Sequence, residues 1–185
     1  SFEQRHRGSV VLDYRTGPTD PVALQNLSVN LLFSFNSGHR YTRSTGGIGQ
    51  RAADEGALLT SSDPRNRVPL EPLNASTTPW YFRTDLRLEK GFTFGRATAT
   101  AYMYIENLLN RRNPVNVYLR TGSATDDGFL NNPELSQEIV AAQGPDYVYY
   151  YQQINLRNRQ HYIADEEVDL LDRPRQVRLG LRLEF

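Results

Sequence analysis

The sequence predicts an all-β protein, more specifically a segment of an antiparallel transmembrane β-barrel with long extracellular loops. Five segments alternate apolar and polar residues with the period of a strand. Each is about 11 residues long, which is the length that a tilted strand needs to cross a bilayer. Their connections are alternately short and long, which is typical of outer-membrane barrels and unusual in compact soluble domains.

The first two strands are expected over residues 5–15 and 26–36. Val10, Leu12 and Tyr14 share one face of the first strand. In the second strand the apolar face comprises Leu27, Val29, Leu31, Phe33 and Phe35, and the opposite face comprises Ser28, Asn30, Ser34 and Asn36. The short TGPTDPVALQ connection joins the two strands.

The other three strands are expected over residues 79–89, 96–107 and 175–185. Their apolar faces comprise Trp80, Phe82, Leu86 and Leu88, then Ala97, Ala99, Ala101, Met103 and Ile105, and finally Val177, Leu179, Leu181, Leu183 and Phe185. A tight GFTFG link joins the third strand to the fourth. Extracellular loops are expected over about 38–78 and 109–172. Within the second loop, Pro133 and Gly144 suit the start and the end of a short helix over 133–143.

The direction of each strand follows if the short turns lie on the periplasmic side. Aromatic residues then fall near both membrane boundaries, as in the two girdles of a barrel. One girdle would comprise Tyr14, Phe92, Phe94 and Phe185, and the other Phe35, Tyr41 and Trp80.

Charged residues occupy the strand faces opposite the apolar ones. A single Arg that faced lipid near the midplane would cost about 2–4 kcal/mol, so these residues are expected to face the barrel lumen. Cross-strand ion pairs, for example of Arg87 or Glu89 with the fourth strand, would each contribute roughly 0.2–1 kcal/mol. The predicted lumen-facing residues are Arg83, Asp85, Arg87, Glu89, Glu106, Arg178, Arg182 and Glu184.

Composition limits the possible functions. The 21 basic and 21 acidic residues give a formal net charge of zero, which argues against a general nucleic-acid binder. The absence of cysteine excludes disulfides, thiolate metal sites and a cysteine nucleophile. With three histidines and no specific serine, histidine and acid arrangement, we expect no enzymatic activity, no cofactor and no metal site.

Several segments resemble TonB-dependent outer-membrane receptors. DLRLEKGFTFGRATATAYMYIENLLNRRNPVNVYLRTG (85–122) is similar to their late-barrel stretch, including Lys90 and the Asn-Leu-Leu-Asn segment at 107–110. EQRHRGSVVLDYR resembles their Asp-Gln-Arg-His strand opening, with Glu3 in place of Asp. FSFNSGHRYT resembles their Ser-Gly-x-Pro-Tyr-Thr loop entry, with Arg40 in place of Pro. RPRQVRLGLRLEF resembles their closing strand, with its final Phe185. The Oar-like subset, with a carboxypeptidase-regulatory-like N-terminal domain, is most similar.

The resemblance implies a barrel of about 22 strands closed by an N-terminal plug, with uptake driven through a TonB box. It places the chain in the bacterial outer membrane as part of the wall and loops. The implied partners are outer-membrane lipid, the remaining strands and plug of the same barrel, TonB through the N-terminal part, and the barrel-assembly machinery, which would read Phe185. Because five strands do not close a barrel, the chain is expected to be the C-terminal piece of a longer polypeptide or one part of a composite barrel.

Four loop tyrosines are candidates for stacking on sugars or flat ligands: Tyr147, Tyr149, Tyr150 and Tyr151. Packing within the loop, including an extra hairpin, is the alternative. Asp126, Asp127 and Gly128 suggest a turn more strongly than a cation site. Two other functions remain open, which are a structural or adhesive outer-membrane component without transport and a soluble β-sandwich binding module.

Overall fold

The computed structural model describes residues 4–45, 68–157 and 169–185, and the chain forms two compact units. The sheet unit comprises His6–Asn36, Phe82–Arg112 and Arg173–Phe185. The loop unit comprises Ser1–Arg5, Ser37–Tyr81 and Asn113–Asp172. Residues 46–67 and 158–168 of the two predicted loops lie outside the described residues.

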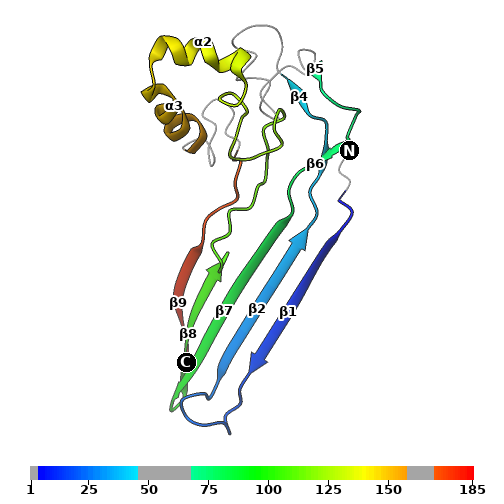
Figure 1. The fold of residues 1–185 in the computed structure, drawn as a ribbon. Coiled ribbons are helices and arrows are strands. Elements are labelled where there is room, and N and C mark those ends of the chain that lie inside the picture. Colours follow the sequence, from blue (N-terminus) through cyan, green and yellow to red (C-terminus); the bar gives the residue numbers. More distant parts are fainter. Residues whose placement is uncertain (1–3, 46–67, 158–168) are drawn as a thin grey trace. The chain divides into compact units, whose positions relative to one another are not determined.

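The sheet unit is a five-stranded antiparallel sheet (Figure 1). The strand order is β1-β2-β7-β8-β9, with bounds Arg7–Arg15, Leu27–Asn36, Tyr81–Phe94, Ala97–Glu106 and Gln176–Glu184. The prediction of an antiparallel sheet of five long strands is therefore confirmed, in a structure that is mostly β but also contains short helices. The sheet is open, and β1 and β9 form its two edges.

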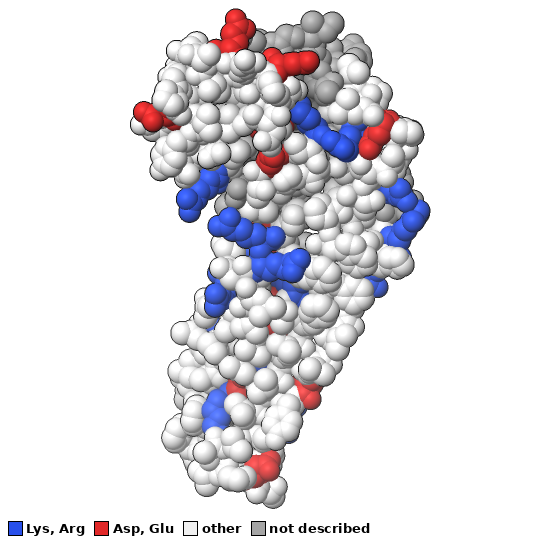
Figure 2. Space-filling view, viewed as in Figure 1, with Lys and Arg blue, Asp and Glu red and all other residues white. Residues whose placement is uncertain are grey.

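The pairing register places the apolar residues of all five strands on one face. Leu12 lies opposite Leu31, and Met103 lies opposite both Leu88 and Leu179. This apolar face is open in the described chain, since Leu12 is 60% exposed and Leu179 is 75% exposed. The surface over the strands in Figure 2 is accordingly mostly uncharged.

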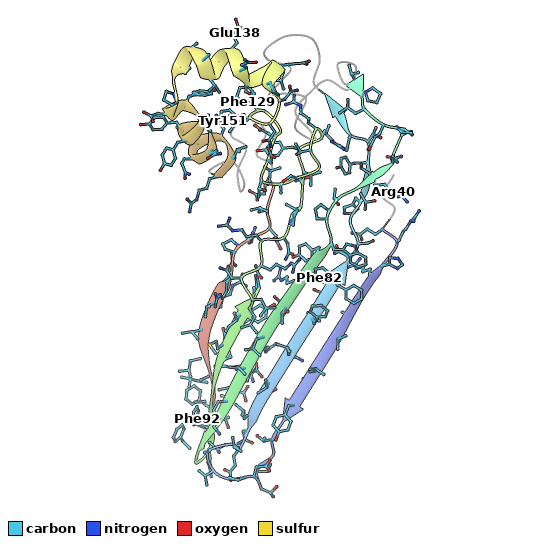
Figure 3. The ribbon with its side chains drawn as sticks, viewed as in Figure 1. Arg40, Phe82, Phe92, Phe129, Glu138 and Tyr151 are labelled. Carbon is cyan, nitrogen blue, oxygen red and sulfur yellow. The ribbon has the colours of Figure 1, made fainter. Side chains whose placement is uncertain are left out.

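The third strand is longer than predicted. The sequence suggested a GFTFG link after residue 89, but β7 continues to Phe94 and only Gly95 and Arg96 form the turn. Gly95 has a φ of 64°, which suits a two-residue hairpin. Phe92 and Phe94 continue the apolar alternation, so strand pairing is more favourable than an early turn. Figure 3 shows Phe82 and Phe92 towards opposite ends of β7.

One lysine lies on the apolar face, and its ammonium group has local partners. Lys90 Nζ donates to the carbonyl oxygens of Ala23, at 3.1 Å, and Gln25, and lies 5.8 Å from the ring centroid of Phe92. The backbone N–H of Gly91 also donates to the carbonyl of Asn26, at 2.9 Å. The connection between β1 and β2 is thereby fixed to β7.

The described residues of the loop unit form two small sheets and three helical segments. β3 (Arg40–Tyr41) pairs with β6 (Ser76–Thr77), and β4 (Ser44–Thr45) pairs with β5 (Val68–Pro69). The helices are α2 (Pro133–Gln143), as predicted, α3 (Asp146–Tyr151) and the π-helix η2 (Gln152–Arg157). None of the described helices is long and apolar enough to span a membrane.

Tyr41 was predicted to belong to an aromatic girdle, and that assignment is wrong. Its side chain is only 9% exposed and belongs to a buried cluster with Val117 and Leu119. A second buried cluster comprises Tyr118, Ala124, Leu170 and Leu171. The loop unit therefore has an apolar interior of its own, which loop residues far apart in sequence build together.

A glycine in β9 makes room for an aromatic ring and yields a test of the register. Tyr102 lies directly opposite Gly180, and a Cβ at Gly180 would lie 2.2 Å from Cζ and Oη of Tyr102. We expect Gly180→Val to lower the free energy of unfolding by about 1–3 kcal/mol, because the added side chain overlaps the ring. Denaturant titration of the folded protein measures this change.

The Tyr102→Ala background is the control for this substitution. Removal of the ring should abolish most of the penalty, which a double-mutant cycle detects as a coupling between the two positions. An equal penalty in both backgrounds would mean that the two residues are not in register.

Candidate functional site

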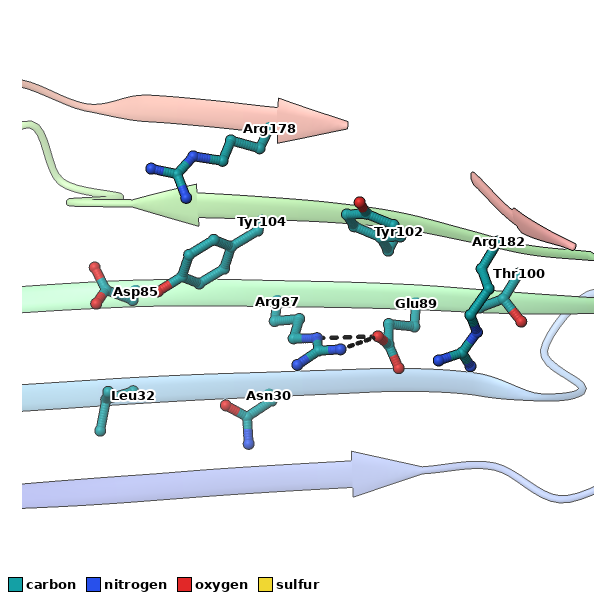
Figure 4. Close-up of a pocket in the computed structure, with 10 residues that line it drawn as sticks. All are labelled: Asn30, Leu32, Asp85, Arg87, Glu89, Thr100, Tyr102, Tyr104, Arg178 and Arg182. Carbon is teal, nitrogen blue, oxygen red and sulfur yellow. Dashed lines mark hydrogen bonds and ion pairs between the residues drawn. The ribbon is translucent and has the colours of Figure 1, made fainter. Parts of the chain in front are cut away.

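The polar face of the sheet carries an open hollow of about 490 Å³ (Figure 4). Four of the five strands contribute to its lining. The lining residues are Asn30 and Leu32 from β2, Asp85, Arg87 and Glu89 from β7, Thr100, Tyr102 and Tyr104 from β8, and Arg178 and Arg182 from β9.

The arginines of this face are paired with carboxylates, mostly along their own strands. Arg87 Nε donates to Glu89 Oε1 at 3.0 Å, Arg83 Nε to Asp85 Oδ1 at 2.8 Å, and Arg182 Nε lies 3.1 Å from Glu184 Oε1. Residues two apart in a strand project to the same face, which allows this pairing. The prediction that Arg87 or Glu89 would form an ion pair with β8 is wrong, because the two residues pair with each other within β7.

Glu106 provides the ionic connection between strands. Its two carboxylate oxygens lie 3.4 Å from Arg83 Nη2 in β7 and 3.4 Å from Arg178 Nη2 in β9. The Glu106 side chain is 19% exposed, so solvent screens these pairs less than it screens Arg182 and Glu184. One carboxylate thus links the two strands on either side of β8.

The eight residues predicted to face a lumen all project from the polar face. Five of them line the hollow, and Arg83, Glu106 and Glu184 form ion pairs on the same face. The list of candidates did not include Asn30, Thr100, Tyr102 and Tyr104. The period-two alternation already placed these four on the polar face, but a search restricted to charged residues passes over them.

Asp85 has a structural role that its charge alone did not indicate. It is 7% exposed, and its Oδ1 atom accepts hydrogen bonds from Arg83 Nε and from the backbone N–H of Asn107, both at 2.8 Å. Asn107 in turn is 3% exposed and has a φ of 53°. Asp85 therefore fixes the point at which the chain leaves β8.

The hollow is suited to contact with polar, hydrated molecules. It offers guanidinium, carboxylate, amide and hydroxyl groups, with three arginines against two carboxylates among its lining. Because the charges are already paired with each other, they create little net field for one sign of ion. The lining provides many weak hydrogen-bonding positions for water and polar solutes.

The four candidate tyrosines lie in α3, where a helix replaces the extra hairpin considered for this segment. Tyr151 is 6% exposed, donates a hydrogen bond to Asp127 Oδ2, and stacks on Phe129 at 4.7 Å between ring centroids (Figure 3). Tyr147 is one turn earlier, 5.9 Å from the Tyr151 ring. These two belong to the packing of the loop unit.

Tyr149 and Tyr150 lie on the other side of α3. They are 62% and 57% exposed, and their rings meet edge to face at 5.9 Å between centroids. Only these two of the four candidates are presented to solvent, so a stacking site would be limited to them. The helical period therefore divides the cluster that the sequence presented as one.

The segment at 126–128 is a turn, as its composition favoured. Asp126 Oδ1 accepts from the backbone N–H of Gly128 at 2.8 Å, and Asp127 Oδ1 accepts from that of Phe129 at 2.9 Å. Both carboxylates are thus engaged by the loop itself. Among the described residues no group of three or more histidine, aspartate or glutamate side chains is arranged to hold a metal ion.

Phe185 follows β9 and is 99% exposed. Its role as an assembly signal stays a prediction. Comparison of this chain with protein-family models, with curated proteins and with solved structures finds no match. The geometry of the two units is therefore the basis for any functional conclusion.

The contact between Tyr151 and Asp127 yields a test of the loop unit. Tyr151→Phe removes the hydroxyl that donates to a buried carboxylate, and we expect it to destabilise the loop unit by about 1–3 kcal/mol. Hydrogen exchange of amides near α3 and the 117–129 segment measures this loss. Tyr150→Phe removes an exposed hydroxyl and should leave exchange unchanged. Equal exchange in both variants would contradict the assigned role.

Proposed function

We propose that this chain forms part of the wall and extracellular loops of a TonB-dependent outer-membrane receptor for energy-coupled substrate uptake. The observation that carries the proposal is the division of the sheet into a continuous apolar face and an opposite face of paired charges. In this reading the apolar face contacts lipid, and the hollow with its charged lining belongs to the hydrated lumen.

The energetics of the two faces support this assignment. An exposed row of large apolar side chains in water is unfavourable, whereas the same row in hydrocarbon is not. Leu179, Leu181 and Leu183 are 75%, 63% and 54% exposed and follow one another on β9. The charged residues between them would each cost about 2–4 kcal/mol if they faced lipid, and they project the other way.

Aromatic residues at both ends of the apolar face also support a membrane setting. Tyr14, Phe92 and Phe94 lie near the two short turns. At the other end Phe33 stacks on Phe82, with 6.4 Å between centroids, and tilts against Phe35 at 6.0 Å. Aromatic rings favour the two interfaces of a bilayer. Lys90, bound to carbonyls near the short turns, resembles a lysine that extends to an interface.

The open edges of β1 and β9 indicate further strands. No unpaired strand edge persists in hydrocarbon, because each free N–H or C=O group there costs several kcal/mol. The rest of the barrel would pair with both edges, and the plug, TonB and the assembly machinery would act through that larger barrel. A structural barrel without transport would have the same wall, so the presence of a plug with a TonB box distinguishes the two.

Cell fractionation tests the membrane assignment. In a Gram-negative host the intact protein should be found in the outer membrane, should need detergent for extraction, and should migrate differently on a denaturing gel before and after heating. These properties follow if the apolar face of the sheet contacts lipid and further strands of the parent protein close the barrel. Recovery from the soluble fraction would instead favour a β-sandwich module that buries the apolar face against another sheet.

A charge on the lipid-facing side gives a residue-level test. Leu181→Arg should lower the free energy of unfolding in lipid vesicles by about 2–4 kcal/mol, and so reduce the heat-modifiable species. Leu73→Arg is the matched control, because Leu73 is 84% exposed and belongs to the loop unit. If both substitutions have the same small effect, the apolar face does not contact lipid.

A further inference from the structure

Four arginines gather where the chain leaves β8 and enters β9. Arg111 and Arg112 follow β8, and Arg173 and Arg175 precede β9; together they are called the arginine cluster here. All four are exposed, and the segments 107–112 and 173–176 contain no acidic residue. Figure 2 shows basic side chains near these strand ends.

Two asparagines hold the backbones of this cluster together. Asn107 Nδ2 donates to the carbonyls of Arg111, at 3.0 Å, and Arg173, at 3.2 Å, while its Oδ1 atom accepts from the N–H of Arg111 at 2.9 Å. Asn110 Oδ1 accepts from the N–H of Arg175 at 3.0 Å. The two segments that carry the arginines are therefore joined directly.

The conformation of these asparagines explains why the motif is Asn-Leu-Leu-Asn. Asn107 and Asn110 have φ values of 53° and 50°, in the left-handed region that asparagine tolerates better than most residues. The same side chains then bind the backbone of the next segment. Conformation and hydrogen bonding both favour asparagine here. The two asparagines therefore hold in place the backbone segments that carry the arginines.

A small apolar hollow adjoins the cluster. It has a volume of about 220 Å³ and is lined by Phe33, Phe82, Thr84, Leu109 and Arg111. The Arg111 guanidinium carbon lies 4.8 Å from the centroid of the Phe82 ring, and Leu109 is 71% exposed. Arg111 thus belongs to the arginine cluster and also lines the apolar hollow.

We propose that the arginine cluster binds the phosphate headgroup of an anionic lipid whose acyl chain lies in the Phe33, Phe82 and Leu109 hollow and along the apolar face. This inference rests on the proposed membrane function. Guanidinium groups bind phosphate oxygens through paired, charge-assisted hydrogen bonds. A basic cluster alone would suit any phosphate, but the adjoining apolar hollow adds a place for an alkyl chain.

The geometry also accounts for the position of the cluster along the strand. Phe33, Phe35 and Phe82 mark the end of the apolar face opposite the short turns. Phosphates of a bilayer leaflet lie just beyond its hydrocarbon, at the depth where aromatic residues concentrate. A lipid held here would therefore have its phosphate beside Arg111 and Arg175 and its chain against the phenylalanines.

Binding of dodecyl phosphate to the full-length chain in a nonionic polyoxyethylene detergent tests the proposal. Isothermal titration calorimetry compares it with dodecyl maltoside, which has the chain without the charge, and with inorganic phosphate, which has the charge without the chain. We expect dodecyl phosphate to bind at least about tenfold more tightly than either, since only it engages both parts of the site. Added salt should weaken its binding.

Variants locate the site. Arg111→Ala with Arg175→Ala should weaken dodecyl phosphate binding by about tenfold or more, while Arg111→Lys, which keeps the charge but loses the planar fork, should weaken it less. Arg96→Ala removes an equally exposed arginine from the β7–β8 turn and should have no effect. Circular dichroism verifies that each variant is folded. If the double variant is not folded, dodecyl phosphate binding by Arg111→Lys tests the role of Arg111.

Three results would overturn the inference. Equal affinity for inorganic phosphate and dodecyl phosphate would mean that the site binds an ion only. Equal affinity for dodecyl maltoside and dodecyl phosphate would mean that it binds alkyl chains only, and unchanged binding in the Arg111 and Arg175 variants would mean that the phosphate binds elsewhere. None of these results affects outer-membrane fractionation. Failure of the lipid site is therefore distinguishable from failure of the proposed function.

Discussion

The pairing register of β7, β8 and β9 is the constraint on which both faces of the sheet depend. Because successive strand residues point to opposite faces, a slip of one residue would bring Arg178 and Arg182 to the apolar face. Three features fix the alignment. The Gly95 and Arg96 turn sets β7 against β8, the Tyr102 ring occupies the space above Gly180, and Glu106 pairs with arginines of both neighbouring strands. Each acts at a different height along the sheet, so the register is determined along its whole length.

The Asp85 and Asn107 interaction extends this constraint to the loops. Asp85 binds the backbone of Asn107, and the Asn107 side chain binds carbonyls on both sides of the long insertion between β8 and β9. The two ends of this insertion are thereby held together at the sheet. A long loop closed in this way adds little to the conformational cost of pairing β8 with β9, since that cost grows only slowly with loop length.

The sequence was sufficient to predict the five strands and the residues on each of their faces, because period-two alternation is a local signal that is retained in the folded sheet.

The sequence was not sufficient where contacts between residues far apart in the chain determine the position of a side chain. Arg87 pairs with Glu89 in its own strand, which alternation cannot distinguish from cross-strand pairing. Tyr41 is buried by residues about 80 positions away, and Tyr147 to Tyr151 divide between interior and surface only once the segment is known to be helical. The role of Asn107 depends on a left-handed backbone that no pattern of hydrophobicity reveals. Within the candidate site the charged residues were found, but the neutral ones between them were not.

Arginine occurs in two different surroundings in the described part of this chain. On the polar face each of Arg83, Arg87 and Arg182 has a carboxylate two residues away, so positive charge is neutralised where it arises. The arginine cluster instead combines exposed arginines with asparagine amides, which are uncharged and hold the backbone. In the proposed barrel, paired charges suit a lumen wall that is in contact with water, since a net electrostatic field would retain ions. The proposed lipid site requires instead an exposed guanidinium beside an apolar contact, as Arg111 provides next to Phe82. Asparagine suits position 107 because its Nδ2 atom donates to the carbonyls of Arg111 and Arg173, which a carboxylate cannot do. At position 110 an aspartate could also accept from the N–H of Arg175, but it would add a negative charge beside the arginines.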